Sequence, residues 1–136
     1  MAVAITSTLC AEMVRAAEEA APLECCGLLL GQGDTVTAIL PAANISDTPD
    51  NAFLIDPVVL VQAQRAARQG GPDILGHYHS HPNGRSEPSE RDQAQALPDG
   101  RLWAIIASGK VRFWRALPDQ SGKGGAVFVP EERVAP

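Results

Sequence analysis

Positive charge is scarce in this chain. Its 136 residues include 11 lysines and arginines against 16 aspartates and glutamates, which gives a net charge of −5 at pH 7. Proteins that bind nucleic acid usually carry a basic patch or stripe, so this balance argues against nucleic acid as a partner. Acidity of this size mainly favours solubility.

Long apolar runs are also missing. No stretch approaches the ~18–20 apolar residues that a membrane-spanning helix needs. Residues 1–15, MAVAITSTLCAEMVR, lack the charged start and the long apolar segment of a signal peptide. We therefore expect a cytoplasmic protein that does not bind a membrane.

Cysteine is rare and odd in number. The three cysteines are Cys10, Cys25 and Cys26, and the last two are adjacent. This spacing makes a poor disulfide framework and suits a reducing compartment. We expect Cys25 and Cys26 to contribute packing alone.

Hydrophobic residues make up 45% of the sequence, which is enough for one globular domain over residues 1–136. Apolar spacing and turn residues predict three helices, at 8–20 (capped by Ser7 or Thr8), 56–69 and 89–97. They predict short strands at 3–6 and 53–55. Longer strands are predicted at 26–32, 35–42, 73–81, 102–108, 111–117 and 126–130. The first two longer strands are expected to form a hairpin. The interleaving of helices and strands indicates an α/β or α+β class with a central sheet of about six strands.

The stretch HYHSHPNGRSEPSERD, residues 77–92, holds all three histidines of the chain. On a strand, His77, His79 and His81 point to one face, because side chains alternate with period two. Imidazoles two residues apart can converge on one ion, at roughly 2.0–2.1 Å for each Zn–N bond. The loop after Pro82 can return the first turn of the next helix, and with it Asp92, to the strand end. Three protein ligands leave a fourth position for water, as in catalytic zinc sites.

Each half of this pattern also has a plain structural interpretation. Two histidines on a strand can be surface residues or hydrogen-bonded core residues. Ser89 and Asp92 form S-x-x-D, which is a helix capping box. Taken together, the two halves are far more constrained and favour a metal site. His77 lies one pair further back on the strand, so we expect it to support or pack around the ligands.

A water at such a site needs a proton acceptor, and Glu24 is the candidate. It lies in PLECCGLLLG, at the start of a strand that otherwise consists of apolar residues. Glutamate is rarely buried unless it is paired or functional. The alternative is a solvated carboxylate in the turn after Pro22.

With these residues the sequence resembles the JAMM/MPN⁺ metalloproteases, the Mov34/MPN/PAD-1 group, in their compact stand-alone bacterial form. The signature of that family is a glutamate on an early strand followed by H-[ST]-H-P-x₆-S-x₂-D. It is matched here by Glu24, His79, Ser80, His81, Pro82, Ser89 and Asp92. The resemblance implies an α/β (α+β) single-domain fold with a mostly antiparallel, curved central sheet of about six strands and two or three flanking helices.

The resemblance also implies a mechanism. One Zn²⁺ per chain would be bound by His79, His81 and Asp92 and would activate a water. Glu24 would take the proton of that water and pass it to the leaving amine. Ser89 would hydrogen-bond the oxyanion of the tetrahedral intermediate.

The implied substrate is the C-terminal Gly-Gly tail of a ubiquitin-like sulfur-carrier protein. The enzyme would either release an amino acid such as cysteine from this tail or trim the tail. Family members that cleave lysine-linked ubiquitin chains carry insertions, whereas the loops around the motif are short here, so a small leaving group is expected. The tail is expected to add as a strand beside an exposed sheet edge. Alternatives are a deubiquitinase-like isopeptidase, a general metallopeptidase, a non-catalytic MPN scaffold and a metal-binding module. The oligomeric state is not predicted.

Overall fold

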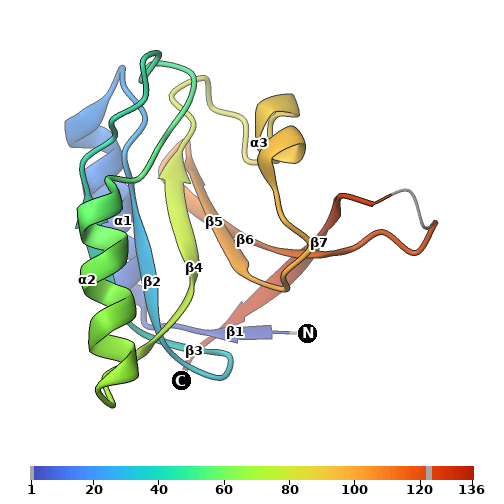
Figure 1. Cartoon of the computed structure of the whole chain (residues 1–136). Helices are drawn as coiled ribbons and strands as arrows, with labels where there is room; N and C mark the ends of the chain where they lie inside the picture. Colours follow the sequence, from blue (N-terminus) through green and yellow to red (C-terminus); the bar gives the residue numbers. More distant parts are fainter. Residues whose placement is uncertain (1, 122–123) are drawn as a thin grey trace.

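The computed structural model describes residues 2–121 and 124–136, and over these ranges it forms seven strands and three helices (Figure 1). In chain order the elements are β1 (Ala2–Ala4), α1 (Ser7–Ala20), β2 (Cys26–Gln32), β3 (Thr35–Ala42), α2 (Pro57–Arg68), β4 (Asp73–Ser80), α3 (Glu90–Gln95), β5 (Leu102–Ala107), β6 (Lys110–Pro118) and β7 (Ala126–Val134). None of the helices in the described ranges is long and apolar enough to cross a bilayer.

The strands form one sheet that closes on itself in the order β1, β3, β2, β4, β5, β6, β7. Four of the pairings, β2–β3, β2–β4, β5–β6 and β6–β7, are antiparallel. The pairings β4–β5, β1–β3 and β1–β7 are parallel. The predicted α+β class with a mostly antiparallel, curved sheet is confirmed, with seven strands in place of about six.

Two local predictions are wrong. Residues 53–55 do not form a strand, because the side chain of Asn44 bonds the carbonyl of Ala52 and the N–H of Leu54, and only Ile55 bridges to Asn44. The first helix is capped by Thr6, whose Oγ1 accepts a hydrogen bond from the N–H of Leu9 at 3.2 Å. Ser7 and Thr8 lie inside that helix.

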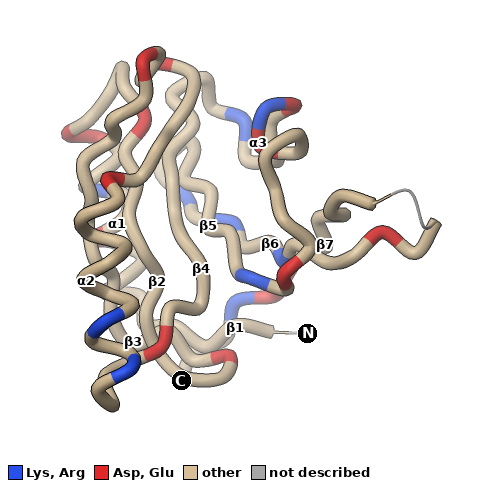
Figure 2. Tube along the Cα trace, viewed as in Figure 1, with Lys and Arg blue, Asp and Glu red and all other residues tan. Residues whose placement is uncertain are grey.

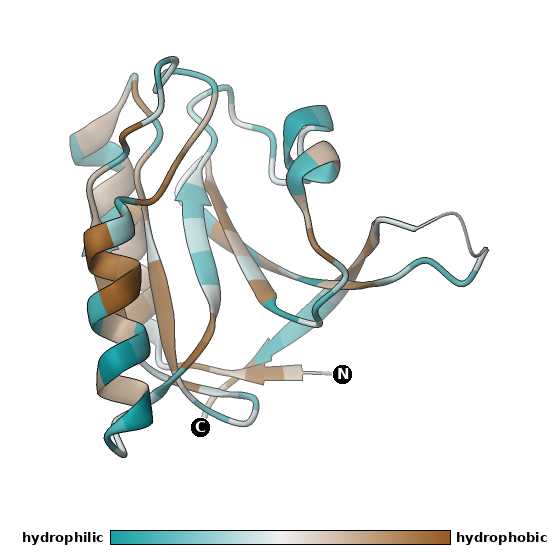
Figure 3. Ribbon diagram, in the orientation of Figure 1, coloured by the Kyte–Doolittle hydropathy of each residue, from teal (hydrophilic) through white to brown (hydrophobic). Residues whose placement is uncertain are grey.

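Side chains pack on two faces of the sheet. On one face α1 lies against a core that includes Met13, Leu29 and Tyr78. On the opposite face a second cluster contains Trp103 and Trp114, with aromatic residues of the 44–55 loop and of β7 packed against it. The strand β4 sends Tyr78 to the first face and its histidines to the second, and Figure 3 shows hydrophilic bands in β4 between hydrophobic stretches of β2 and β5.

Candidate metal and catalytic site

The strand β4 holds His79 near its C-terminal end, and His81 directly follows the strand. His79 is paired on both sides, with Cys26 of β2 and with Ile105 of β5. The N–H of His81 extends the β4–β5 ladder by donating to the carbonyl of Ile106 at 2.9 Å. Both imidazoles are buried, and their Nε2 atoms lie 3.0 Å apart.

The helix α3 brings Asp92 to the same point. Its Oδ2 lies 3.2 Å from Nε2 of His79 and 3.1 Å from Nε2 of His81. The same oxygen accepts a hydrogen bond from the N–H of Ser89 at 2.9 Å, and Ser89 Oγ accepts one from the N–H of Asp92 at 3.0 Å. The capping box therefore exists, and it aims the Asp92 carboxylate at the histidines. Figure 2 shows α3 carrying residues of both charges, with two acidic residues in its first turn.

The cluster is short of protons. His81 Nδ1 lies 2.7 Å from the carbonyl of Arg85, which can only accept, so Nδ1 carries a proton. In the neutral form of the ring, Nε2 then presents a lone pair. That lone pair faces Oδ2 of Asp92, which is also an acceptor. Of the three atoms that meet here, only Nε2 of His79 could then carry a hydrogen. A cation relieves this repulsion. Two atoms bound at about 2.0–2.1 Å to one tetrahedral zinc are about 3.3 Å apart, so separations of 3.0–3.2 Å fit such an ion.

The pKa values of the three cluster residues are shifted in different directions. Burial alone would raise the pKa of Asp92, but its contacts with His79 and His81 hold that pKa well below its usual range. Burial lowers the pKa of His79, which keeps its ring neutral. For His81 burial is outweighed by the contacts with Asp92 and the Arg85 carbonyl, and the pKa is raised.

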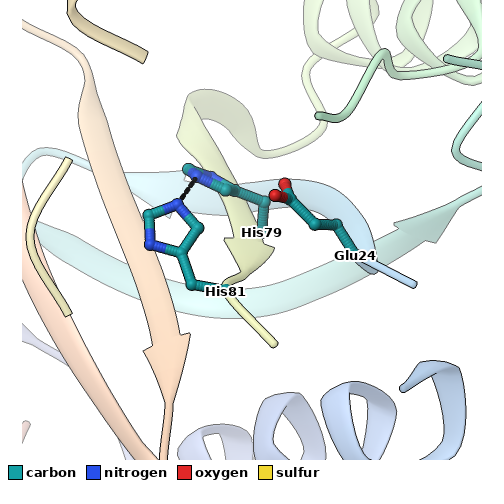
Figure 4. Close-up of side chains that lie close together, drawn as sticks. All are labelled: Glu24, His79 and His81. Atoms are coloured by element: carbon teal, nitrogen blue, oxygen red, sulfur yellow. Dashed lines mark hydrogen bonds between the residues drawn. The ribbon is translucent and has the colours of Figure 1, made fainter. Parts of the chain in front are cut away.

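Glu24 lies before β2 and is only 6% exposed, so the solvated-turn alternative is wrong. Its N–H donates to the carbonyl of Pro49 at 2.7 Å, and its carbonyl accepts from Nδ2 of Asn44 at 3.0 Å. Figure 4 shows its carboxylate directed toward His79 and His81, within 4.8 Å of a ring nitrogen of each. Burial raises the pKa of Glu24 from its ordinary 4.5 to about 7.

Two ligand sets are possible on distance, because Glu24 and Asp92 both lie near the two histidines. The contacts of Asp92 are shorter, 3.1 and 3.2 Å, and match neighbouring ligands of one ion. For Glu24, a carboxylate oxygen lies within 4.8 Å of a ring nitrogen of each histidine. Both carboxylates therefore lie beside the two histidines, and Asp92 makes the shorter contacts.

The other residues singled out in the sequence lie around this cluster. His77 packs edge-on against Trp103, with ring centroids 4.3 Å apart, and its ring has no place among the three converging groups. Burial lowers the pKa of His77 to about 3. Burial raises the pKa of the Cys25 thiol, and that of Cys26 to about 12, so neither is a thiolate near neutral pH.

Two residues of the site were missed by sequence reasoning. Phe53 stacks on the ring of His79, and Asn44 bonds the backbone on both sides of Phe53 as well as that of Glu24. The signals were a single aromatic residue in a polar loop and an asparagine at the end of a strand, where its side chain commonly bonds nearby backbone.

Comparison with known proteins places the chain in a family. Residues 6–117 match a family described as prokaryotic homologs of the JAB domain, and because this match covers most of the chain, the protein belongs to that family. The predicted membership is confirmed.

Two curated relatives are similar over part of their length. The desampylase of Haloferax volcanii is 38% identical over 88 residues, which are 63% of this chain and 63% of that protein. The probable TtuB-protein conjugate cleaving protease of Thermus thermophilus is 40% identical over 76 residues, which are 56% of this chain and 51% of that protein. The chain thus spans between half and two thirds of each.

Two solved structures share the fold. A protein of Desulfitobacterium hafniense, 27% identical, superposes with a TM-score of 0.79 over 98% of this chain and 92% of that one. A JAB1/MPN domain protein of Archaeoglobus fulgidus, 22% identical, superposes with a TM-score of 0.59 over 98% of this chain and 97% of that one. The fold is therefore of the JAB1/MPN type.

Proposed function

We propose that the protein is a zinc-dependent hydrolase that cleaves conjugates of a ubiquitin-like protein after the C-terminal Gly-Gly tail of that protein. The observation that carries the proposal is the meeting of Asp92 Oδ2 with two histidine Nε2 atoms at 3.1–3.2 Å. The names of two relatives, a desampylase and a conjugate-cleaving protease, support the substrate class.

His79, His81 and Asp92 would hold the ion. A zinc ion bound there acts as a Lewis acid on the substrate carbonyl and lowers the pKa of water toward about 7. The protein contributes a buried, preformed set of donors, since Asp92 is fixed by the helix cap and His81 by the Arg85 carbonyl. Fixed donors need no rearrangement when the ion binds.

Glu24 and Ser89 would carry out the proton and charge steps. Glu24 accepts a proton from the attacking water and returns it to the leaving amine, and a pKa of about 7 lets one carboxyl do both near neutral pH. Ser89 Oγ already accepts from the N–H of Asp92, which leaves its hydroxyl hydrogen free for the carbonyl oxygen that becomes negative. Such a donor is typically worth about 10²–10³ in rate.

A cavity of about 460 Å³ beside the cluster is the place for the tail. It is lined by the 44–55 loop and α3, including Thr48, Ala52, Phe53, Leu54, Arg91 and Gln95. Phe53 contacts His79, and Arg91 precedes Asp92 in the chain, so the cavity lies next to the residues of the site. Strand addition at β4 is not possible, because β2 and β5 occupy both of its edges. Glycines in the tail would let its backbone pass close to the ion.

The size of the leaving group is a separate question. The relative named for cleaving TtuB-protein conjugates favours a second protein as the leaving group, whereas the short loops favour a single residue. We propose that both are accepted when they follow Gly-Gly, and that a sulfur-carrier protein with one added C-terminal cysteine is the faster substrate.

The experiment compares three substrates by mass spectrometry: such a carrier with a C-terminal Gly-Gly-Cys, the same carrier joined by its tail to a lysine side chain, and lysine-linked diubiquitin. Cleavage after Gly-Gly by the zinc-loaded wild type, and its loss in Glu24→Gln, is the expected result. Cleavage of unrelated unfolded peptides at equal rate would instead indicate a general metallopeptidase. Faster cleavage of diubiquitin would overturn the choice of carrier and leave the zinc chemistry standing.

A further inference from the structure

The two histidines of the cluster are held in different ways. His81 Nδ1 donates to the carbonyl of Arg85 at 2.7 Å, which fixes both its tautomer and its ring plane. His79 Nδ1 is buried and has no hydrogen-bond partner among residues 2–121 and 124–136. Metal-binding histidines are usually oriented by a hydrogen bond at the second ring nitrogen. On the Nδ1 side, packing must therefore hold the ring of His79.

That packing is aromatic. Phe53 lies face to face with His79, with ring centroids 4.2 Å apart and planes 18° apart. Trp103 meets His79 edge-on at 5.8 Å, and His77 lies at 6.3 Å with its ring tilted by 45°. Of these three neighbours, Phe53 alone covers a face of the imidazole, and it alone comes from a loop.

The loop is built to hold Phe53 in place. Asn44 Nδ2 donates to the carbonyl of Ala52 at 3.0 Å, and Asn44 Oδ1 accepts from the N–H of Leu54 at 3.0 Å. The residues on either side of Phe53 are thus tied to one side chain. Asn44 Nδ2 also donates to the carbonyl of Glu24, so the same side chain fixes the loop to the backbone of Glu24.

We infer that Phe53 is a positioning residue, whose stacked ring fixes the imidazole plane of His79 and so directs Nε2 at the point shared with His81 and Asp92. The inference rests on the proposed role of His79 as a metal ligand. Without the ring, the imidazole of His79 can tilt about its side-chain bonds, because Nδ1 has no hydrogen-bond partner among the described residues to hold the far side of the ring.

The test measures metal binding, not turnover alone. Wild type, Phe53→Leu, Phe53→Tyr and Phe128→Leu are stripped of metal and titrated with zinc against a chromophoric chelator, and the visible spectrum of each is recorded with Co²⁺. Phe128 is the matched control, because it is half-buried like Phe53 and meets Trp103 edge-on at 4.8 Å, on the same aromatic cluster.

Phe53→Leu is expected to weaken zinc binding by about 10–100-fold, as other losses of ligand support do, and to change the Co²⁺ spectrum. Phe53→Tyr keeps the ring and should stay close to wild type, as should Phe128→Leu. If Phe53→Leu does not fold by circular dichroism, Phe53→Met provides the same two readouts.

Wild-type zinc affinity and Co²⁺ spectrum in the folded Phe53→Leu protein would overturn the inference. A rise in KM alone would then assign Phe53 to contact with the tail in the cavity. His79→Ala distinguishes failure of the proposed metal site from failure of the inferred role of Phe53. If it binds zinc as wild type does, the proposed metal site itself is wrong; if it loses zinc while Phe53→Leu does not, only the inference on Phe53 fails.

Discussion

At the scale of single residues, one oxygen atom of Asp92 belongs both to the cap of α3 and to the histidine cluster. Its Oδ2 accepts the N–H of Ser89 and lies beside both histidine Nε2 atoms. A capping box and a metal site are therefore compatible interpretations of S-x-x-D, since the cap fixes the carboxylate that the ion would need. Because one carboxylate takes part in both, S-x-x-D alone could not be identified as a cap or as part of a metal site.

Zinc content tests this arrangement. Wild type should contain about one zinc per chain, and the double variant Asp92→Ala, His81→Ala should lose it, because only one ligand of the three remains. His77→Ala should keep its zinc, since His77 contacts Trp103 and lies outside the converging atoms. Elemental analysis of the purified proteins measures all three. Unchanged zinc in the double variant would contradict the assignment of ligands.

Glu24 makes the stability of the zinc-free protein depend on pH. Its pKa is raised by burial from 4.5 to about 7, so between these pH values the folded state binds more protons than the unfolded state. Stability must then fall as pH rises through this window and level off above it. Glu24→Gln removes the titration and should therefore be more stable than wild type at pH 8, by up to about 3 kcal/mol at 1.36 kcal/mol for each pKa unit.

The comparison is made by urea denaturation in the presence of a chelator. At pH 4.5 the two proteins should differ little, because the Glu24 carboxyl is then largely protonated in the folded state. A difference that is equal at both pH values, or one that favours wild type at pH 8, would show that the Glu24 carboxylate is not destabilised by burial.

At the scale of elements, β4 was predictable and the 44–55 loop was not. Alternation of histidines along residues 77–81 places them on one face from sequence alone. The loop has no periodicity, and its shape depends on Asn44, which bonds residues 8 to 20 positions away. Phe53 reaches His79 only because of those bonds. Closure of the sheet could not be predicted from the sequence either, because it depends on the pairing of β1 with β3 and β7, which are distant in the chain.

Gly76 shows how closely β4 and β5 approach. It pairs with Leu102, and a Cβ atom at this position would overlap the Leu102 carbonyl. Gly76→Ala should therefore lower the free energy of unfolding by about 3 kcal/mol, at the upper end of the usual cost of overpacking. Urea denaturation measures the loss, with Thr37→Ala on the exposed side of β3 as a control that should change little. A loss below about 1 kcal/mol would mean that the two strands can separate without cost.

At the scale of the whole molecule, the sheet is closed by few backbone contacts. The strand β1 joins β3 through the single pair Ala4–Thr35. Arg115 of β6 adds side-chain ties in this region. It bonds Glu131 of β7, the carbonyl of Gly100 at 3.0 Å, and Asp34, in the turn between β2 and β3, at 3.1 Å. One guanidinium therefore links segments up to 81 positions apart in the sequence.

The bond from Arg115 to Glu131 is the part that matters for stability. The Arg115 side chain is 13% exposed and that of Glu131 is fully buried, whereas Asp34 is 64% exposed and contributes little. Removing one partner of a buried pair usually costs about 3–5 kcal/mol, because the other charge stays buried without it. Arg115→Ala should lower the free energy of unfolding by about this amount.

Arg112→Ala is the matched control. Arg112 lies on the same strand, pairs with Glu87 at 3.6 Å and lies 4.3 Å from the centre of the Trp114 ring. Because the Arg112 and Glu87 side chains are both exposed, the loss of Arg112 should cost only about 1 kcal/mol. Urea denaturation in low and in high salt separates the two cases, because salt screens an exposed pair much more than a buried one. Equal losses in the two variants would show that the buried pair does not stabilise the closed sheet. A large loss confined to Arg115→Ala, and insensitive to salt, is the expected result.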